Sequence, residues 1–381
     1  MTTALVNGRV LTSHGLQSGF AVLVDGDRIS GLALPSDSRV RQAERHDLCG
    51  NYLLPGFIDC QVNGGGGVLL NDTPTVDGIR AIATAHRQFG TTSLLPTLIS
   101  DDREVMREAI GAVSAAVEEG VPGVLGIHVE GPFLAPERKG VHDAGKFRVP
   151  DAEDVALIGS MTHGVTLLTL APERVPMQTI QALLARGVIV SAGHTAADYA
   201  TVRTALDVGV RGFTHLFNAM SPFTSREPGA VGAALEDIDS WCGLIVDGHH
   251  VHPASLRVVI AAKPRGKMFL VTDAMPPVGS DDPSFVLKGE TITARDGICQ
   301  TAEGVLAGSA LDMASAVRNC VNLLGLPLAE AARMASTYPA DFLGLSHTHG
   351  RVAAGCRADF AVLDESLHVQ ETWIAGEHQT H

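Results

Sequence analysis

The stretch TTSLLPTLISDDREVMREAIGAVSAAVEEGVPGVLGIHVEGP, residues 91–132, contains the smallest unit of a regular pattern. Residues 91–99 form a largely apolar run with the length of a buried strand. Residues 103–120 then resemble a helix that ends in a glycine, as helices often do. A second apolar run follows at 124–132. The order strand, helix, strand predicts two parallel strands joined by a crossover helix.

The same unit recurs along the middle of the chain. The predicted strands are 56–63, 91–99, 124–132, 165–173, 187–195, 212–220, 242–250 and 268–276. The helix-like segments include 76–90, 103–120, 177–187 and 198–209. About eight repeats of strand and helix predict an α/β fold of the (β/α)8 TIM-like barrel type. A doubly wound open sheet is the alternative, but NGGGG at 63–67 lacks the GxGxxG spacing that would favour it.

Both ends of the chain have a different pattern of polar and apolar residues. Residues 4–12 and 20–32 alternate polar and apolar side chains around NG and DG turns, and residues 358–377 repeat this alternation. We therefore predict one small β-domain built from residues 1–54 and 346–381, and a catalytic barrel from 55–345.

The composition excludes several classes of protein. The net charge of −14 and the absence of basic clusters argue against nucleic-acid binding, and an anionic substrate would need cations placed locally. No apolar run approaches the length of a membrane span, and the first residues do not resemble a signal peptide. The six cysteines are scattered without a CxxC pair, which favours free thiols and a cytoplasmic location.

Titratable side chains follow strand after strand, at the face where barrel enzymes build their sites. Glu130, His194 and His215 end the third, fifth and sixth predicted strands. A carboxylate and two imidazoles that meet at one barrel mouth match a His2Glu metal site with an open fourth position. His128 taken alone is better explained as a structural histidine that lines the barrel.

Asp273 follows the eighth predicted strand. One interpretation gives it a merely structural role, as a helix cap or a structural carboxylate. Next to a metal, it could instead take a proton from water and return it to a leaving nitrogen. We expect the second role.

Motifs spread along nearly the whole chain carry a resemblance to a known family. They are PGFIDCQVNGGGG (55–67), HVEGPF (128–133), KGVHD (139–143), SAGHT (191–195), THLFNAMSPFTSREPG (214–229), DGHHVHP (247–253), VTDAM (271–275) and LAGS (306–309). In this order they resemble the N-acetylglucosamine-6-phosphate deacetylase family of the amidohydrolase superfamily. The resemblance implies a barrel with a small β-sandwich, in a homodimeric cytoplasmic enzyme of amino-sugar catabolism or cell-wall recycling.

The resemblance also implies a role for each matching residue. Glu130, His194 and His215 would bind one divalent metal ion per subunit, which we expect to be zinc. Asp273 would be the catalytic acid and base, and His142 would stabilise the oxyanion. The implied substrate contacts are Val141, Asn218, Ala219, Arg226, His250 and the segment Leu306, Ala307 and Gly308. Arg226 and His250 would grip the phosphate, and one such contact could cross the dimer interface.

Gln61 and Asn63 stand on the first predicted strand, where some members of the family carry His-x-His and bind two metals. Members with Gln-x-Asn bind one. We therefore expect a single metal here, with Gln61 beside a water as the remnant of a second site. Asn63 is expected only to shape the turn.

Two alternatives remain at this point. The substrate could be N-acetylgalactosamine 6-phosphate, because the orientation of one hydroxyl is not encoded in any motif. A scaffold that has lost its chemistry is the second alternative, and it should lack some of Glu130, His194, His215 and Asp273. Whether the loop 134–148 acts as a lid is open.

Overall fold

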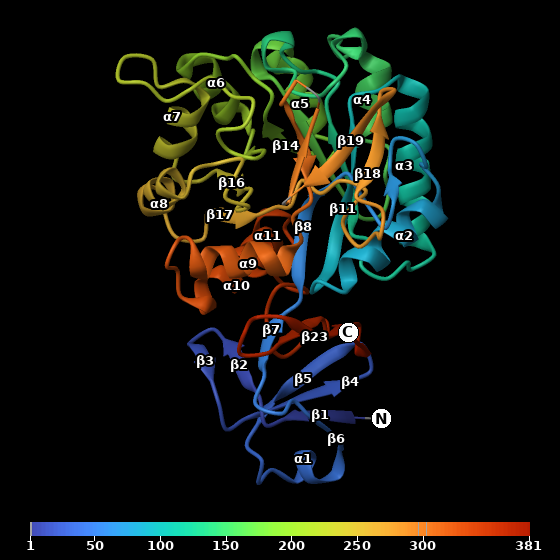
Figure 1. Cartoon of the computed structure of the whole chain (residues 1–381), viewed down its shortest axis with the longest axis vertical. Coiled ribbons are helices and arrows are strands. Elements are labelled where there is room, and N and C mark those ends of the chain that lie inside the picture. Colours follow the sequence, from blue (N-terminus) through green and yellow to red (C-terminus); the bar gives the residue numbers. More distant parts are fainter. Residues whose placement is uncertain (1, 296, 302) are drawn as a thin grey trace.

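The computed structural model describes residues 2–295, 297–301 and 303–381. Its centre is a sheet of eight parallel strands that curls into a barrel (Figure 1). The strands are β8 (Phe57–Val62), β11 (Thr91–Ile99), β12 (Gly126–Glu130), β13 (Val165–Leu170), β14 (Ile189–Ala192), β15 (Gly212–Phe213), β16 (Trp241–Leu244) and β17 (Met268–Leu270). Each overlaps one of the eight predicted strands, and the predicted fold class is confirmed.

The barrel closes where its first and last strands meet. Seven neighbouring pairs are parallel ladders, from β8 through to β17. Just beyond these ladders, Val62 forms an isolated parallel bridge with Ala274, and the Asp273 amide donates to the Gln61 carbonyl at 3.0 Å. The seam therefore lies at the ends of β8 and β17, beside the candidate site.

Helices cover the outside of the barrel (Figure 1). They are α2 (Val76–Arg87), α3 (Arg103–Glu118), α4 (Ala152–Ile158), α5 (Met177–Leu184), α6 (Tyr199–Val208), α7 (Gly229–Glu236), α8 (Pro253–Ala262), α9 (Met313–Asn322), α10 (Leu328–Ala335) and α11 (Thr337–Phe342). All four predicted helices are present. In α6, Asp198 caps the first turn and Gly209 ends the helix at φ 118°, a conformation that favours glycine. Among the described residues, no helix has both the length and the apolar character needed to cross a membrane.

Two further sheets contain the ends of the chain, which lie together below the barrel in Figure 1. One consists of β1 (Thr2–Val6), β4 (Ala21–Asp25), β5 (Arg28–Ala33) and β6 (Glu44–Asp47), with the short helix α1 (Ser38–Gln42) between β5 and β6 in the chain. The other consists of β2 (Arg9–Thr12), β3 (Gly15–Gln17), β7 (Tyr52–Pro55), β22 (Phe360–Leu363), β23 (Val369–Ile374) and β24 (Glu377–Thr380).

These sheets share an apolar core, as a β-sandwich does. Leu5, Val22 and Val24 from one sheet join Phe360 and Trp373 from the other in one buried cluster. The DG turn at residues 25–26 joins β4 and β5 as a hairpin, as predicted. The NG pair at residues 7–8 does not form one, because β1 and β2 belong to different sheets and the chain crosses between them here.

The division of the chain at residues 54 and 346 stays a prediction. It is supported by the separate core of the two terminal sheets. However, Leu54, Ala361 and Leu363 pack into the apolar cluster of the barrel. The two parts therefore share packed side chains across the boundary.

A small antiparallel sheet follows the last barrel strand and was not predicted. Its strands are β18 (Ser284–Leu287), β19 (Glu290–Arg295), β20 (Ile298–Gln300) and β21 (Leu306–Ser309). Phe285, Leu287 and Cys299 pack with Met275 and Ile99, which follow or end barrel strands. The sheet therefore lies against the mouth of the barrel (Figure 1).

His128 lies inside the barrel, in agreement with its structural interpretation. Its ring is buried, with Nε2 2.7 Å from Thr169 Oγ1 and Nδ1 3.4 Å from Thr97 Oγ1. Burial lowers the pKa of His128 from 6.5 to about 4. Because the unfolded chain binds this proton more readily, the folded state loses stability as the pH falls from 6.5 towards 4.

We predict that His128→Gln flattens this dependence. Glutamine can donate and accept hydrogen bonds but does not titrate, so the thermal midpoint of the parent should fall more steeply than that of the variant over this pH range. Differential scanning calorimetry of both proteins provides the measurement. Parallel curves would show that His128 is not the buried group responsible.

Candidate functional site

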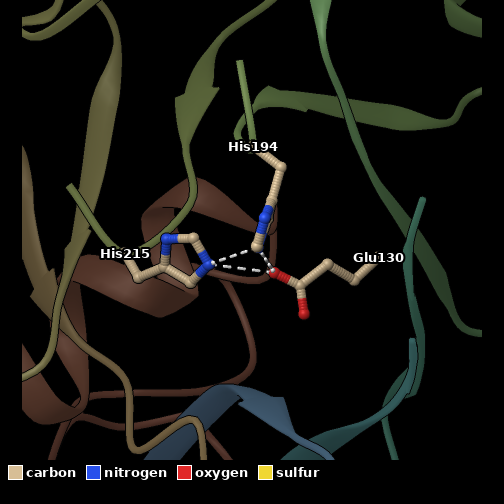
Figure 2. Close-up of side chains that lie close together, drawn as sticks. All are labelled: Glu130, His194 and His215. Carbon is tan, nitrogen blue, oxygen red and sulfur yellow. Dashed lines mark hydrogen bonds and ion pairs between the residues drawn. The ribbon is translucent and has the colours of Figure 1, made fainter. Parts of the chain in front are cut away.

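The candidate metal ligands come from three separate strands. Glu130 is the last residue of β12, while His194 and His215 each follow a strand by two residues, β14 and β15. Both histidines have left-handed backbones, with φ of 47° and 33°. Parallel strands end at one face of the barrel, so these side chains converge. Figure 2 shows all three pointing toward one another.

The three ligand atoms lie very close together. Glu130 Oε1 is 3.0 Å from His215 Nε2 and 3.2 Å from His194 Nε2, and the two nitrogens are 3.1 Å apart. All three side chains are buried. Among the described residues, no other group of three His, Cys, Asp or Glu side chains meets the spacing expected of metal ligands.

The hydrogen bonds around this cluster suit a cation. His194 Nδ1 donates to the Arg138 carbonyl at 2.8 Å, which fixes the proton on Nδ1 and leaves a lone pair on Nε2. That lone pair faces a carboxylate oxygen and a second imidazole nitrogen. Electron-rich atoms at such separations need a positive charge between them, and a Glu-His-His set can hold a divalent metal.

Asp273 lies beside the cluster, at the seam of the barrel where β8 and β17 meet. Its Oδ1 accepts from Asn63 Nδ2 at 2.7 Å and from Gln61 Nε2 at 3.1 Å. No hydrogen bond reaches Oδ2 from any residue that the structure describes. Burial, and then the charge of Glu130, raise the pKa of Asp273. These surroundings suit a carboxylate that accepts and releases a proton on Oδ2.

Gln61 and Asn63 do more than was expected of them. The Gln61 amide lies between two carboxylates, since its Nε2 is 3.2 Å from both oxygens of Glu130 and also reaches Asp273. Asn63 does not merely shape the turn, because its amide orients Asp273. These two neutral donors offset part of the negative charge that Glu130 and Asp273 bring into a buried space.

His142 comes from the loop between the short 3-10 helices η1 (Pro136–Arg138) and η2 (Ala144–Lys146). Its Nδ1 accepts from the Ser100 amide at 3.3 Å, so the proton of the neutral ring is on Nε2. Burial, followed by the nearby His194, holds the pKa of His142 well below its usual value. Nε2 lies 4.0 Å from Glu130 Oε2, and the neutral ring can donate a hydrogen bond into the cavity.

A cavity of about 230 Å³ opens over these groups. Most of the predicted site residues line it, namely Asn63, Glu130, Val141, His142, His194, His215, Asn218, Ala219, His250, Asp273, Leu306 and Gly308. The backbone at Ala219 is left-handed, with φ 50°, which lets the chain turn at the rim.

Three predicted residues do not line the cavity, and one of them is Gln61, whose amide lies between Glu130 and Asp273. Arg226 is exposed on the segment before α7 and is not part of the cavity wall in this chain. Ala307 is fully buried among Met275, Phe285 and Cys299, so its side chain supports the wall from behind.

Asp247 has a part in the site that the sequence did not reveal. Its Oδ2 lies 2.6 Å from His250 Nδ1, and its Oδ1 accepts the main-chain amides of His249 and His250. The carboxylate therefore orients the His250 ring. The spacing of Asp247 and His250 in DGHH was the available signal. Gly140 also lines the cavity and was not predicted. Its backbone lies so near His194 that a Cβ at this position would be 3.4 Å from His194 Cε1.

A barrel whose mouth holds this Glu-His-His cluster and an adjacent aspartate defines a class of hydrolases, and the chain belongs to the amidohydrolase family, whose model matches residues 52–378. It is 44% identical to N-acetylgalactosamine-6-phosphate deacetylase from Shewanella sp. (strain ANA-3), over 97% of this chain and 94% of that protein.

Solved structures agree over the whole chain. The structure of N-acetylglucosamine-6-phosphate deacetylase from Pasteurella multocida superposes with a TM-score of 0.96 at 36% identity, covering 100% of both chains. A mutant N-acetyl-D-glucosamine-6-phosphate deacetylase from Mycobacterium smegmatis, in complex with N-acetyl-D-glucosamine-6-phosphate, gives 0.91 at 34% identity. That match covers 99% of this chain and 98% of the other.

We predict that the purified protein contains about one equivalent of divalent metal per chain, and that His194→Ala reduces this to a small fraction. The variant removes one of three ligands, and the two that remain, Glu130 and His215, are too few to hold the ion. Inductively coupled plasma mass spectrometry measures the content. His163→Ala, on the exposed surface, is the matched control and should retain the metal. Equal metal in both variants would contradict the assigned site.

Proposed function

We propose that this protein removes the acetyl group from N-acetyl-D-glucosamine 6-phosphate, giving D-glucosamine 6-phosphate and acetate. The observation that carries the proposal is one cavity that contains the Glu130–His194–His215 cluster, Asp273 and His142. The activities named for the relatives supply the substrate. The retention of all these side chains argues against a scaffold without chemistry.

The cluster would hold one divalent metal per chain. Zinc is the metal we propose, because two imidazoles and one carboxylate are a frequent donor set for catalytic zinc. When bound, such an ion acts as a Lewis acid that makes water a better nucleophile and polarises the amide carbonyl.

Asp273 would move the proton. Its Oδ2 accepts the proton of the attacking water, whose oxygen bonds to the acetyl carbon. The same oxygen then delivers that proton to the amide nitrogen as the C–N bond breaks, so that acetate and an amine are released. The raised pKa of Asp273 makes its carboxylate a stronger base, which favours acceptance of the proton from water.

His142 would stabilise the charge that develops on the carbonyl oxygen. Its Nε2 carries the proton of a neutral ring, and the Ser100 amide holds the ring from the other side. A donor fixed in advance costs no reorganisation when the oxyanion forms, and the loss of one such donor typically slows turnover about a hundredfold or more.

The remaining residues of the cavity would hold the sugar phosphate. Val141, Asn218 and Ala219 would contribute polar main-chain or amide groups, and Leu306 and Gly308 also line the cavity. His250, oriented by Asp247, would donate to the phosphate. These contacts place the acetamide against Asp273 and His142, and accurate placement of this kind lowers the barrier.

Arg226 would complete the phosphate site from a second subunit. It is exposed and lies outside the cavity of its own chain, and nearby Phe223 is 61% exposed. A homodimer that covers Phe223 could bring Arg226 of one protomer to the cavity of the other. We also propose a cytoplasmic location, which the six free cysteines support.

N-acetylgalactosamine 6-phosphate is the second candidate substrate. The relative that shares 44% identity with this chain is named for that activity, a higher identity than that of either deacetylase structure described above. The two sugars differ in one hydroxyl, which leaves the metal cluster and its chemistry unchanged.

We predict acetate release from N-acetylglucosamine 6-phosphate in a panel that also contains its galactose epimer and both unphosphorylated sugars. Comparison of kcat/KM separates the two candidates, and preference for the galactose epimer would favour the second. Asp273→Asn should lower kcat by at least about a thousandfold while the metal content stays at the parent level. A protein with metal but no activity on any N-acetyl sugar would contradict the proposed reaction.

We predict that Arg226→Ala raises KM for the phosphorylated sugar about tenfold or more and leaves kcat within about twofold, because a charged hydrogen bond to phosphate is lost. Weak turnover of the unphosphorylated sugar should not change. If Arg226 acts across an interface, mixing Arg226→Ala with Asp273→Asn subunits should restore the parent KM at some active sites. In such mixed dimers, the Asp273→Asn subunit supplies Arg226 to the cavity that still contains Asp273. Equal KM values for parent and variant would remove Arg226 from the site.

A further inference from the structure

A buried carboxylate that the mechanism does not use lies directly behind Asp273. Asp59, on β8, is fully buried. Its Oδ2 accepts the Thr272 hydroxyl at 2.5 Å, and its Oδ1 accepts the main-chain amides of Gln61 at 3.1 Å and Thr272 at 3.3 Å. Three donors thus point at one carboxylate inside the seam between β8 and β17.

The Thr272 hydroxyl connects Asp59 to the backbone on the far side of Asp273. While it donates to Asp59, its oxygen accepts the Ala274 amide at 3.3 Å. One hydroxyl therefore bridges the residues before and after Asp273. A valine in this position would keep the shape of the side chain but would lose both hydrogen bonds.

Asp273 needs such a constraint because its backbone is in the left-handed region, with φ 54°. A residue with a side chain holds this conformation only where its surroundings impose it. Ser309 assists from the other side, since its hydroxyl donates to the Thr272 carbonyl and its amide to the Asp273 carbonyl. The peptide groups on both sides of Asp273 are thus fixed by hydrogen bonds.

We infer that Asp59 is a positioning residue, which acts through Thr272 to hold the backbone of Asp273 so that its carboxylate meets Asn63 and the cavity. The inference rests on the proposed function of Asp273. Burial raises the pKa of Asp59 to about 7, and hydrogen bonds from Thr272 and Gln61 oppose this rise. Three hydrogen-bond donors surround the Asp59 carboxylate, an arrangement that favours its ionised form.

Thr272→Val tests the inference. We expect kcat to fall about tenfold to a hundredfold, because a small displacement of a reacting group has an effect of this size. KM should stay within about twofold of the parent value and the metal content should not change, since neither the rim of the cavity nor the metal ligands are altered. Thr272→Ser retains the hydroxyl and should restore most of kcat.

Thr372→Val is the matched control. Thr372 is also fully buried, and its hydroxyl accepts from Arg87, but it lies in β23 of the terminal sheets. This variant should keep the parent kcat. A kcat for Thr272→Val within twofold of the parent, or an equal loss of kcat in Thr372→Val, would overturn the inference. Loss of metal from Thr272→Val would overturn it too.

A crystal structure of Thr272→Val separates this inference from the proposed function. We expect the Asp273 φ to leave the left-handed region, or its carboxylate to lose the 2.7 Å bond to Asn63. An unchanged φ and an unchanged bond would overturn the inference. This measurement needs no substrate, so it decides the role of Asp59 even if the parent releases no acetate. Asp59→Asn, if it folds, should reproduce both the kinetic and the structural effect.

Discussion

Closure of the barrel between β8 and β17 is the constraint on which the candidate site depends. The seam joins the strand that carries Gln61 to the strand that leads into Asp273, through the Asp273 amide and the Gln61 carbonyl. Only when these strands meet do the amides of Gln61 and Asn63 reach the Asp273 carboxylate. The ladders from β11 to β15 then fix Glu130, His194 and His215 on the same face. Backbone pairing thus positions the three candidate metal ligands and Asp273, whereas a loop positions His142.

Charge is the second constraint at this site. Glu130 and Asp59 are buried and Asp273 is partly buried, so three carboxylates lie close together, which is unfavourable unless donors or cations surround them. Amides satisfy much of this need, with Gln61 between Glu130 and Asp273 and main-chain donors at Asp59. The remaining negative charge lies where the lone pair of His194 Nε2 and the ring of His215 also point. The protein interior therefore leaves one position where a cation is the favourable occupant, despite the overall charge of −14.

Much of this arrangement was predictable from the sequence, for physical reasons. Strands buried on both faces have long apolar runs, so all eight barrel strands were found, even β15 with two residues in the ladder. The polar residue after each run marked the ligands, because parallel strands end at one face. The β18–β21 sheet was missed because its strands are short and half-exposed. The NG pair at residues 7–8 did not reveal how the chain continues, since a turn dipeptide does not show whether the next strand joins the same sheet. The roles of Asn63, Asp247 and Asp59 depend on contacts between distant strands, which no local pattern contains.

The pairing of β7 with β22 has a consequence for how the chain acquires its structure. β7 lies between β2 and β22, and Leu53 and Leu54 pair with Val362 and Ala361 from near the other end of the chain. During synthesis, one edge of β7 must wait until β22, more than 300 residues further along the chain, has been made. An apolar strand with an open edge is a template for pairing with other chains. The nascent protein therefore passes through a period in which the sheet of β2, β3 and β7 is incomplete and open to pairing with other chains, until β22 covers the free edge of β7.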